Sequence, residues 1–250
     1  MRHPFRAAAA AAALSVVLAA CGGEESAALK VCSDIPYPPF EFEDAESELG
    51  YTGFDIELIA AIGAELDRDV EIVVTGFDAL TSGTAMAAGT CDLAISAMTI
   101  TPEREEQIDF SDPYYEADQS LLVPNGSMIM SIADLVEGVV VGVQTGTTGE
   151  IYANENVPGA EIRAFEGGGD LLTALAAGQV DAVLQDLPVN VEEAQKGQTT
   201  VVETYPTGEF YGIAFEQGSE LVADVNTALA ALRENGTYDA LFAKYFTAGS

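Results

Sequence analysis

Arg104 is one of only nine basic residues in a 250-residue chain that carries 41 aspartates and glutamates. It stands in the segment SAMTITPEREEQIDFSDPYY, residues 96–115, among several acidic side chains. A guanidinium can hold a carboxylate through two parallel N–H···O bonds, a geometry that lysine cannot reproduce. The alternative is a surface ion pair with Glu103 or Glu105, which would contribute little. The segment therefore indicates a carboxylate ligand for Arg104.

Two other segments could bind the charged ends of a small molecule. Asp186 follows the predicted strand Asp181–Gln185, and ligand sites of α/β proteins form at such strand ends. Its carboxylate could accept an ammonium, although an aspartate by itself is more often a solvated loop residue. The turn QTGTTG, residues 144–149, leads from a predicted strand toward a helix, so its N–H groups can converge on an anion. The lysine of a phosphate-binding loop is missing from it.

The composition excludes several kinds of chemistry. His3 is the only histidine, and it falls in a segment that we expect to be removed, which excludes Ser-His-Asp triads, Cys-His pairs and histidine-based zinc sites. The lysines have no recognisable catalytic context. We therefore expect no catalytic residue, no metal, no cofactor and no enzyme. A net charge of −32 excludes nucleic acid as a partner, because phosphate binding needs a basic surface.

The first 20 residues are typical of a secretory signal peptide. Arg2 and Arg6 precede an apolar run from Ala7 to Leu18, which is shorter than the roughly 20 residues of a membrane span. Removal of residues 1–20 takes away both arginines and no acid, so the net charge becomes −34.

The sequence LAAC, which ends at Cys21, resembles a bacterial lipobox. The resemblance implies a lipid-modified Cys21, with residues 21–28 as a tether to the membrane outside the cytoplasm. The alternative is an ordinary signal peptide in which Cys21 is incidental. Cys32 and Cys91 lie at two predicted strands and could form a disulfide in an oxidising compartment, or remain two buried thiols.

The remaining chain alternates short apolar strands with helices, which is typical of an α/β fold with largely parallel sheets. An apolar stripe of Ile56, Ile59, Ile62 and Leu66 predicts a helix over Asp55–Leu66. We expect Asp170 to cap a helix over Leu171–Ala177. Further helices are expected over Leu221–Arg233 and Tyr238–Tyr245. Strands are expected at Leu29–Ser33, Val70–Val74, Asp92–Ser96, Gln119–Val123, Val139–Gln144, Ile162–Phe165, Asp181–Gln185, Val201–Tyr205 and Tyr211–Phe215.

The alternation occurs twice, which predicts two lobes with two connections between them. Lobe 1 comprises residues 29–113 and 211–250, and lobe 2 comprises residues 118–207. Residues 114–117 and 208–210 form the hinge, and a hinge of two strands allows the cleft between the lobes to close.

Six blocks resemble the extracellular amino-acid-binding proteins of ABC importers, the bacterial solute-binding proteins of family 3. They are DIPYPPFEF, YTGFDIELI, AISAMTITPEREEQIDFSDPYY, VGVQTGTTGE, VDAVLQDLPV and ALRENGTYDALFAKYF, in order from about Leu29 to Phe246. The resemblance implies a two-lobed periplasmic-binding-protein type II fold with the ligand in the cleft. It also implies a monomer whose partners are a free amino acid and the membrane subunits of an ABC importer.

The resemblance also assigns roles to residues. Arg104 would bind the ligand α-carboxylate, with the backbone N–H groups of Thr99 and Thr148. Asp186 would bind the α-ammonium together with the Thr99 hydroxyl and the Ala97 carbonyl.

The ligand side chain would meet Asp34, Tyr37, Phe77 and Gln144. An acid at Asp34, with no lysine at Gln144 to balance it, favours arginine, lysine or histidine, and then glutamine. Two other functions remain open: a dehydratase-like enzyme that acts on a cyclic carboxylate, and an amino-acid sensor coupled to a separate receptor.

Overall fold

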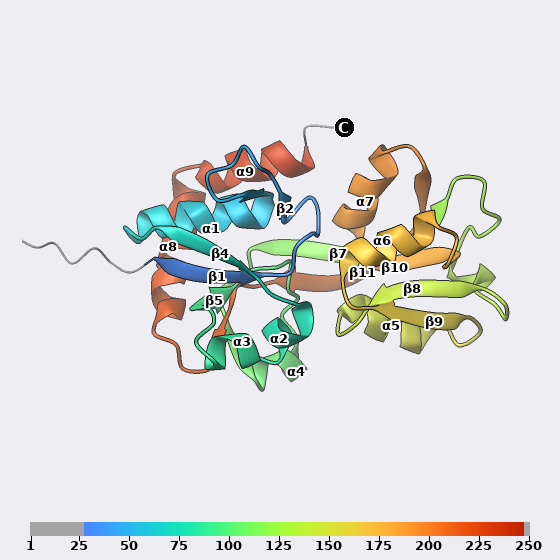
Figure 1. The fold of residues 1–250 in the computed structure, drawn as a ribbon, viewed down its shortest axis with the longest axis horizontal. Coiled ribbons are helices and arrows are strands. Elements are labelled where there is room, and N and C mark those ends of the chain that lie inside the picture. The colour runs from blue at the N-terminus through green and yellow to red at the C-terminus, as the bar shows by residue number, and fades with distance from the viewer. Residues whose placement is uncertain (1–27, 248–250) are drawn as a thin grey trace, which may run out of the picture.

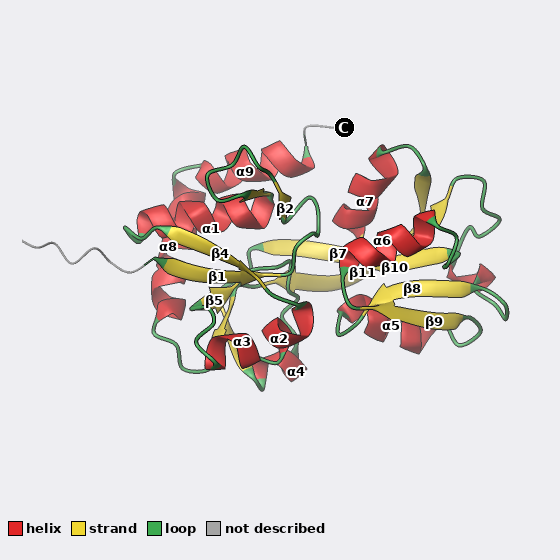
Figure 2. Ribbon diagram, in the orientation of Figure 1, coloured by secondary structure: helices red, strands yellow, loops and turns green. Residues whose placement is uncertain are grey.

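The structure is a computed structural model that describes residues 28–247, and it consists of two lobes, each built on a five-stranded sheet (Figure 1). Helices flank both sheets (Figure 2), which confirms the α/β fold class. The predicted signal peptide, Cys21 and the predicted tether up to residue 27 lie outside the described residues. Within residues 28–247, no helix is both long and apolar enough to span a membrane.

The first sheet combines strands from both ends of the chain. Its order is β4 (Val70–Val74), β1 (Leu29–Ser33), β5 (Leu93–Ala94), β12 (Ala214–Glu216) and β6 (Ile108–Phe110). The long helices α1 (Phe54–Glu65) and α9 (Thr237–Phe246) lie above this sheet in Figure 1, and α8 (Leu221–Glu234) runs along its left side. The short helices α2 (Phe77–Thr81), α3 (Thr84–Ala87) and α4 (Pro102–Glu105) lie below it. A two-stranded hairpin of β2 (Phe42–Glu43) and β3 (Tyr51–Thr52) precedes α1.

The second sheet lies in the other lobe. Its order is β11 (Thr199–Tyr211), β7 (Tyr115–Pro124), β10 (Ala182–Asp186), β8 (Val140–Gln144) and β9 (Glu161–Phe165). The helices of this lobe are α5 (Thr148–Asn156), α6 (Gly168–Ala176) and α7 (Leu187–Gln195), with a 3-10 turn at Ile132–Asp134. Strands β8 and β10 run parallel and end at Gln144 and Asp186, so both side chains lie at the same edge of the sheet.

Strands β7 and β11 run beside each other between the lobes (Figure 1). They pair antiparallel from Tyr115 opposite Tyr211 to Pro124 opposite Thr199, with a register shift between Tyr205 and Glu209. The predicted hinge residues 114–117 and 208–210 lie at the start of β7 and near the end of β11. The lobe boundaries derived from the sequence stay a prediction.

The prediction of largely parallel sheets is wrong. β1 is parallel to β4 and β5, and β8 is parallel to β9 and β10, but the other strand pairs in both sheets are antiparallel. The antiparallel pairs arise because β7, β11 and β12 carry the chain between the lobes.

Two local predictions also differ from the structure. The predicted strand Tyr211–Phe215 is two elements, because β11 ends at Tyr211 and β12 begins at Ala214 in the other sheet. The two residues between them are held by backbone bonds, Gly212 N to Met98 O at 3.0 Å and Ser111 N to Ile213 O at 2.8 Å. Asp170 does not cap α6, which begins at Gly168 with no side-chain cap, since the chain already turns at Gly167.

Helix α1 buries the predicted apolar stripe, with Ile56, Ile59 and Ile62 at most 1% exposed. It begins at Gly53, whose φ is 125° and where a Cβ atom would lie 2.1 Å from the Phe40 carbonyl oxygen. Only glycine can occupy this position, because other residues disfavour a positive φ and would clash with the backbone. The close approach brings the start of α1 against Phe40, whose carbonyl accepts the Asp55 N–H at 3.0 Å.

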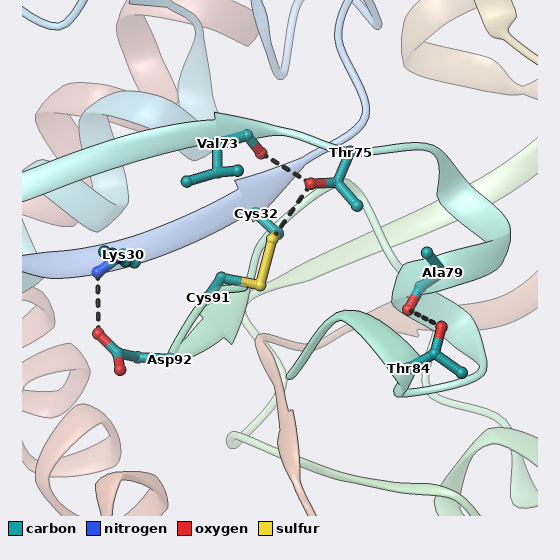
Figure 3. Close-up of a disulfide and its surroundings, with 8 residues drawn as sticks. All are labelled: Lys30, Cys32, Val73, Thr75, Ala79, Thr84, Cys91 and Asp92. Atoms are coloured by element: carbon teal, nitrogen blue, oxygen red, sulfur yellow. Dashed lines mark hydrogen bonds between the residues drawn. A yellow bond between two sulfur atoms is a disulfide. The ribbon is translucent and has the colours of Figure 1, made fainter. Parts of the chain in front are cut away.

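Cys32 on β1 and Cys91 just before β5 form a disulfide, with their Cα atoms 5.7 Å apart (Figure 3). The Thr75 hydroxyl donates to Cys32 Sγ at 3.2 Å, and both half-cystines lie in one buried cluster with Phe77. The disulfide therefore links β1, which leads to Asp34, to the buried cluster that contains Phe77 of α2.

Candidate functional site

A single pocket between the lobes collects the nine residues predicted to bind the ligand. Its space measures about 320 Å³, part of which is open to solvent. Its lining consists of Asp34, Tyr37, Phe77, Ser96, Ala97, Thr99, Arg104, Gln144, Thr147, Thr148 and Asp186. Lobe 1 supplies the first seven and lobe 2 the last four, so the pocket exists only while the lobes are in contact.

Arg104 is a buried cation with no carboxylate at ion-pair distance. It lies on α4, which Thr101 caps by accepting the Arg104 backbone N–H at 3.2 Å, and its side chain is 8% exposed. Nη1 donates to the Thr99 carbonyl at 2.6 Å and Nη2 to the Gly146 carbonyl at 3.0 Å. None of the ion pairs within residues 28–247 includes Arg104.

The charge of Arg104 persists despite this burial. Burial lowers the pKa of the guanidinium to about 10, so it stays protonated at neutral pH, and the ring of Phe77 lies 5.3 Å from its central carbon. An unpaired cation in a low-dielectric pocket is costly unless an anion joins it. A ligand carboxylate would supply that anion.

Asp186 lies across the pocket from Arg104, at the end of β10. Its Oδ1 accepts from Gln119 Nε2 at 2.6 Å, and its Oδ2 accepts from the Tyr37 hydroxyl of the other lobe at 2.9 Å. Burial raises the pKa of Asp186 to about 6, helped by the negative charge of Glu209. A cation bound here would relieve that cost, because it stabilises the ionised carboxylate.

Asp34 and Gln144 meet at another wall of the pocket. Gln144 Nε2, at the end of β8, donates to Asp34 Oδ2 at 2.7 Å and to the Glu166 carbonyl at 3.2 Å. Burial raises the pKa of Asp34 to about 6, and the nearby charge of Asp78 adds to the shift. Neither acid forms an ion pair within residues 28–247, although the negative charge of Asp186 acts on Arg104.

The remaining predicted residues come from lobe edges that face each other. Thr148 begins α5, and its hydroxyl lies 3.5 Å from that of Thr99 in the other lobe. Ala97 has a φ of 44°, a left-handed conformation that is uncommon for alanine. Tyr37 and Phe77 both line the pocket, but Tyr37 is also stacked on Phe40, 6.4 Å between ring centroids.

The sequence reasoning missed three residues in or beside the pocket. Ser96 and Thr147 line it directly, each beside a predicted residue, and Thr147 caps α5 by accepting the Glu150 N–H at 3.2 Å. Gln119 is fully buried, and its amide nitrogen also reaches Glu209 Oε2 at 3.0 Å. A glutamine at the head of an otherwise apolar strand was the available signal for Gln119.

The described part of the chain offers no metal site, since no group of three or more His, Cys, Asp or Glu side chains there could hold an ion. The pocket contains no histidine, lysine or cysteine that could act as base or nucleophile. Its arrangement of one cation and two acids suits binding of a molecule with charges of both signs.

Comparison with known proteins gives consistent matches. Residues 29–248 match the family model of the bacterial extracellular solute-binding proteins, family 3. The lysine/arginine/ornithine-binding periplasmic protein of Escherichia coli strain K12 is 34% identical over 235 residues, covering 87% of each chain. The structure of an ancestral arginine-binding protein bound to glutamine aligns with a TM-score of 0.81 and 37% identity, covering 88% of this chain and 97% of that one.

A third match concerns enzymes. An ancestral amino-acid-binding protein described as a precursor of cyclohexadienyl dehydratase aligns with a TM-score of 0.81 and 41% identity, covering 88% of this chain and 95% of that one.

Proposed function

We propose that this chain, which belongs to the bacterial extracellular solute-binding proteins of family 3, binds a free basic amino acid outside the cytoplasm and delivers it to an ABC importer. The observation that carries the proposal is the placement of Arg104 and Asp186 in one pocket, each buried and without an oppositely charged partner at ion-pair distance. An α-amino acid carries a carboxylate and an ammonium that would complete both.

The α-carboxylate would lie against Arg104 and the N-terminal turn of α5. The N–H of Thr148 is in the first turn of that helix, where backbone N–H groups lack partners within the helix. The α-ammonium would replace or join the neutral donors on Asp186, with the Thr99 hydroxyl and the Ala97 carbonyl as further acceptors. Lobe 1 and lobe 2 would then each hold part of both charged groups.

The ligand side chain would extend toward Asp34, between Tyr37 and Phe77. Asp34 has no basic neighbour within ion-pair distance in residues 28–247, so a cationic side chain gains an ion pair there, whereas a glutamate would face repulsion. Two relatives support this choice. One is named for binding lysine, arginine and ornithine, and the other is named for binding arginine.

A catalytic role is disfavoured. A dehydratase acting on a cyclic carboxylate could also use Arg104, and one structural neighbour is a dehydratase precursor. Asp186 suits an ammonium rather than a second carboxylate, and the pocket lacks an obvious general base other than its two acids. Incubation with a cyclohexadienyl acid followed by product analysis tests this function directly. A receptor-coupled sensor would use the same pocket and would require a separate membrane partner.

Membrane attachment through lipid on Cys21 belongs to the proposal as well. Cys21 lies seven residues before the described part of the chain, and β1 begins one residue after its start. A lipidated Cys21 would hold the two lobes close to the membrane, where the importer subunits lie. The binding unit itself is proposed to be a monomer.

Ligand identity can be tested by thermal-shift screening of the twenty amino acids, since a ligand that binds only the folded state raises the melting temperature. We expect arginine, lysine or histidine to give the largest shift, glutamine a smaller one, and glutamate and aspartate none. In the Asp34→Asn variant, basic ligands should lose about 1 to 3 kcal/mol, or about fivefold to a hundredfold in affinity, because the ion pair is gone. Glutamine should lose less, and calorimetric titration measures both.

The exposed Asp224→Asn substitution on α8 is the matched control, because it removes the same charge far from the pocket. It should leave the ligand order unchanged. If wild-type protein prefers glutamate or a branched aliphatic amino acid, Asp34 does not face the ligand side chain.

Ligand stabilisation should depend on pH with a defined sign. The pKa values of Asp34 and Asp186 are raised from 3.8 to about 6, so each carboxyl is mostly protonated at pH 5 and ionised at pH 7.5. Binding of a basic amino acid requires the ionised forms and should weaken by roughly tenfold per group at pH 5. The melting-temperature shift on adding arginine should therefore be clearly smaller at pH 5 than at pH 7.5.

In the absence of ligand, the same two groups lower the stability of the folded protein as pH rises. A carboxyl whose folded pKa is raised contributes stability below its unfolded value near 4, and this contribution is lost as pH rises through about 6. An arginine-induced shift of equal size at both pH values would mean that neither acid contacts the ligand cations.

A further inference from the structure

Two buried acids lie beneath the pocket and belong to none of the proposed ligand contacts. Glu41 follows the aromatic loop of Tyr37 and Phe40, and Asp55 lies in the first turn of α1. Both side chains are 0% exposed. None of the ion pairs within residues 28–247 includes either acid, so no basic side chain balances them.

Each acid holds a backbone segment of the pocket through hydrogen bonds. The Ser96 hydroxyl donates to Glu41 Oε1 at 2.7 Å and accepts the Asp34 N–H at 3.0 Å. Asp55 Oδ2 accepts the Ala97 N–H at 2.7 Å and the Tyr114 hydroxyl at 2.7 Å. The two acids thus grip Ser96 and Ala97, two adjacent residues that line the pocket.

At least one of the two carboxyl groups must carry a proton. Glu41 Oε2 and Asp55 Oδ1 are both buried without a hydrogen-bond partner, and the two acids hold the adjacent residues Ser96 and Ala97. Two carboxylate oxygens attract each other only when one of them carries a hydrogen. Ionisation of both would place two uncompensated negative charges side by side in the interior.

The proton belongs on Glu41. Asp55 accepts two hydrogen bonds from other groups and Glu41 accepts one, and accepted bonds favour the charged form. Burial raises the pKa of Glu41 well above its ordinary 4.5, and the charge of Asp55 raises it further. Burial also raises the pKa of Asp55, to about 7, against its hydrogen bonds to Ala97 and Tyr114.

The hydrogen bond that Asp55 accepts is donated by a residue in a strained conformation. Ala97 has a φ of 44°, and a left-handed residue other than glycine is strained and persists only where its surroundings enforce that conformation. An N–H donated to a carboxylate is about twice as strong as one donated to a neutral acceptor. The Asp55 carboxylate therefore supplies an interaction strong enough to hold the conformation that Ala97 adopts at the pocket wall.

We propose that Glu41 and Asp55 form a singly protonated pair that positions the ammonium end of the ligand site. Ionised Asp55, the main form above about pH 7, fixes Ala97 in its left-handed conformation. Neutral Glu41 fixes Ser96 and places no second negative charge beside Asp55. The positioning role rests on the proposed function, because it assumes that an ammonium binds beside Ala97. The shared proton is independent of any ligand.

The pair predicts a second, alkaline limit to binding. The titratable groups that face it are Asp34 and Asp186 across the pocket, with Tyr37 and Tyr114 beside it. Asp34 and Asp186 lose their protons at about pH 6 and therefore do not cause a loss of affinity at higher pH. Arg104, whose pKa is about 10, contributes to the loss near that pH in every variant. When Glu41 ionises, the two carboxylates repel each other and release Ser96 and Ala97. Affinity should therefore fall at alkaline pH in wild-type protein.

Three variants separate this role from a general structural one. In Glu41→Gln, the amide nitrogen donates to Asp55 and the amide oxygen accepts from Ser96, so affinity at pH 7 should stay within about threefold of wild type. The alkaline loss should become smaller, because glutamine cannot ionise, and the loss that remains comes from the ligand ammonium and from Arg104, whose pKa is about 10. In Asp55→Asn, the acceptor of the Ala97 N–H becomes neutral, and affinity should fall about tenfold to a hundredfold. The exposed Glu48→Gln is the matched control and should retain the wild-type pH profile.

The measurement combines calorimetric titration with arginine from pH 6 to pH 10 and thermal melts of the same proteins without ligand. In the melts, Glu41→Gln should match wild type at low pH and become the more stable protein as pH rises, since only wild type loses the Glu41 proton. Loss of binding at pH 7 in folded Glu41→Gln, or an alkaline loss of equal size in wild type and Glu41→Gln, overturns the proposal. If Asp55→Asn does not fold, the Glu41→Gln profiles decide the outcome by themselves.

Failure of the proposed function would be visible separately. If wild-type protein binds no amino acid at any pH, the proposed function fails and the positioning role fails with it. The melts then still test the shared proton: parallel profiles of wild type and Glu41→Gln would show that no such proton exists.

Discussion

Arg104→Lys is expected to abolish high-affinity amino-acid binding while the protein stays folded. Lysine keeps the positive charge but offers a single ammonium in place of two parallel N–H groups, and it cannot reach the Thr99 and Gly146 carbonyls together. The loss for a buried carboxylate should be on the order of 2 to 5 kcal/mol, or roughly thirtyfold to several thousandfold in affinity. Calorimetry with the best ligand from the screen measures it.

Arg163→Lys is the matched control. Arg163 lies on β9, is about 40% exposed and pairs with Glu161 at 2.6 Å, so its replacement should leave affinity unchanged. Circular dichroism establishes that both variants are folded. A Kd for Arg104→Lys within threefold of wild type would remove Arg104 from the ligand site.

Asp186→Asn is expected to have an effect of similar size on the other end of the ligand. The substitution removes the charge that would balance the α-ammonium, and it leaves one oxygen instead of two to accept from Gln119 and Tyr37. Affinity should fall by about 2 to 5 kcal/mol, again roughly thirtyfold to several thousandfold. Equilibrium titration at pH 7.5 gives the magnitude.

Two features distinguish this result from damage to the fold. The melting temperature without ligand should change little or rise at pH 7.5, because a buried carboxylate has been removed. The remaining binding should also depend less on pH between 5 and 7.5 than in wild type. Unchanged affinity, with Asp224→Asn as the reference for loss of one charge, would show that the ammonium lies elsewhere.

The sequence was most informative where local patterns decide the structure. Strands β1 and β4 have the predicted bounds, and α1 is displaced by one residue, because alternating apolar runs and a helical stripe are local signals. The nine predicted ligand residues all line one pocket. They could be predicted together because the family resemblance carries long-range information that residue spacing alone lacks. The roles assigned to them stay predictions.

The features that could not be predicted from the sequence depend on contacts between residues far apart in the chain. The mixed direction of both sheets depends on where β7, β11 and β12 return, which no short window records. Glu41 and Asp55 were two acids among 41, and nothing beside them in the chain indicates that they meet. Their pairing depends on the Gly53 turn, which brings the start of α1 against Phe40.

The hydrogen bonds between the lobes also set the timing of exchange. Asp34 to Gln144, Tyr37 to Asp186 and Arg104 to the Gly146 carbonyl each join one lobe to the other across the pocket. A molecule enclosed among these residues would leave after the lobes separate, which breaks those of the three bonds that the ligand has not replaced. Residence time would then be governed by the rate of opening rather than by the strength of any one contact. An importer that receives the ligand would therefore have to accelerate opening, because spontaneous release would be slowest for the ligand that fits best.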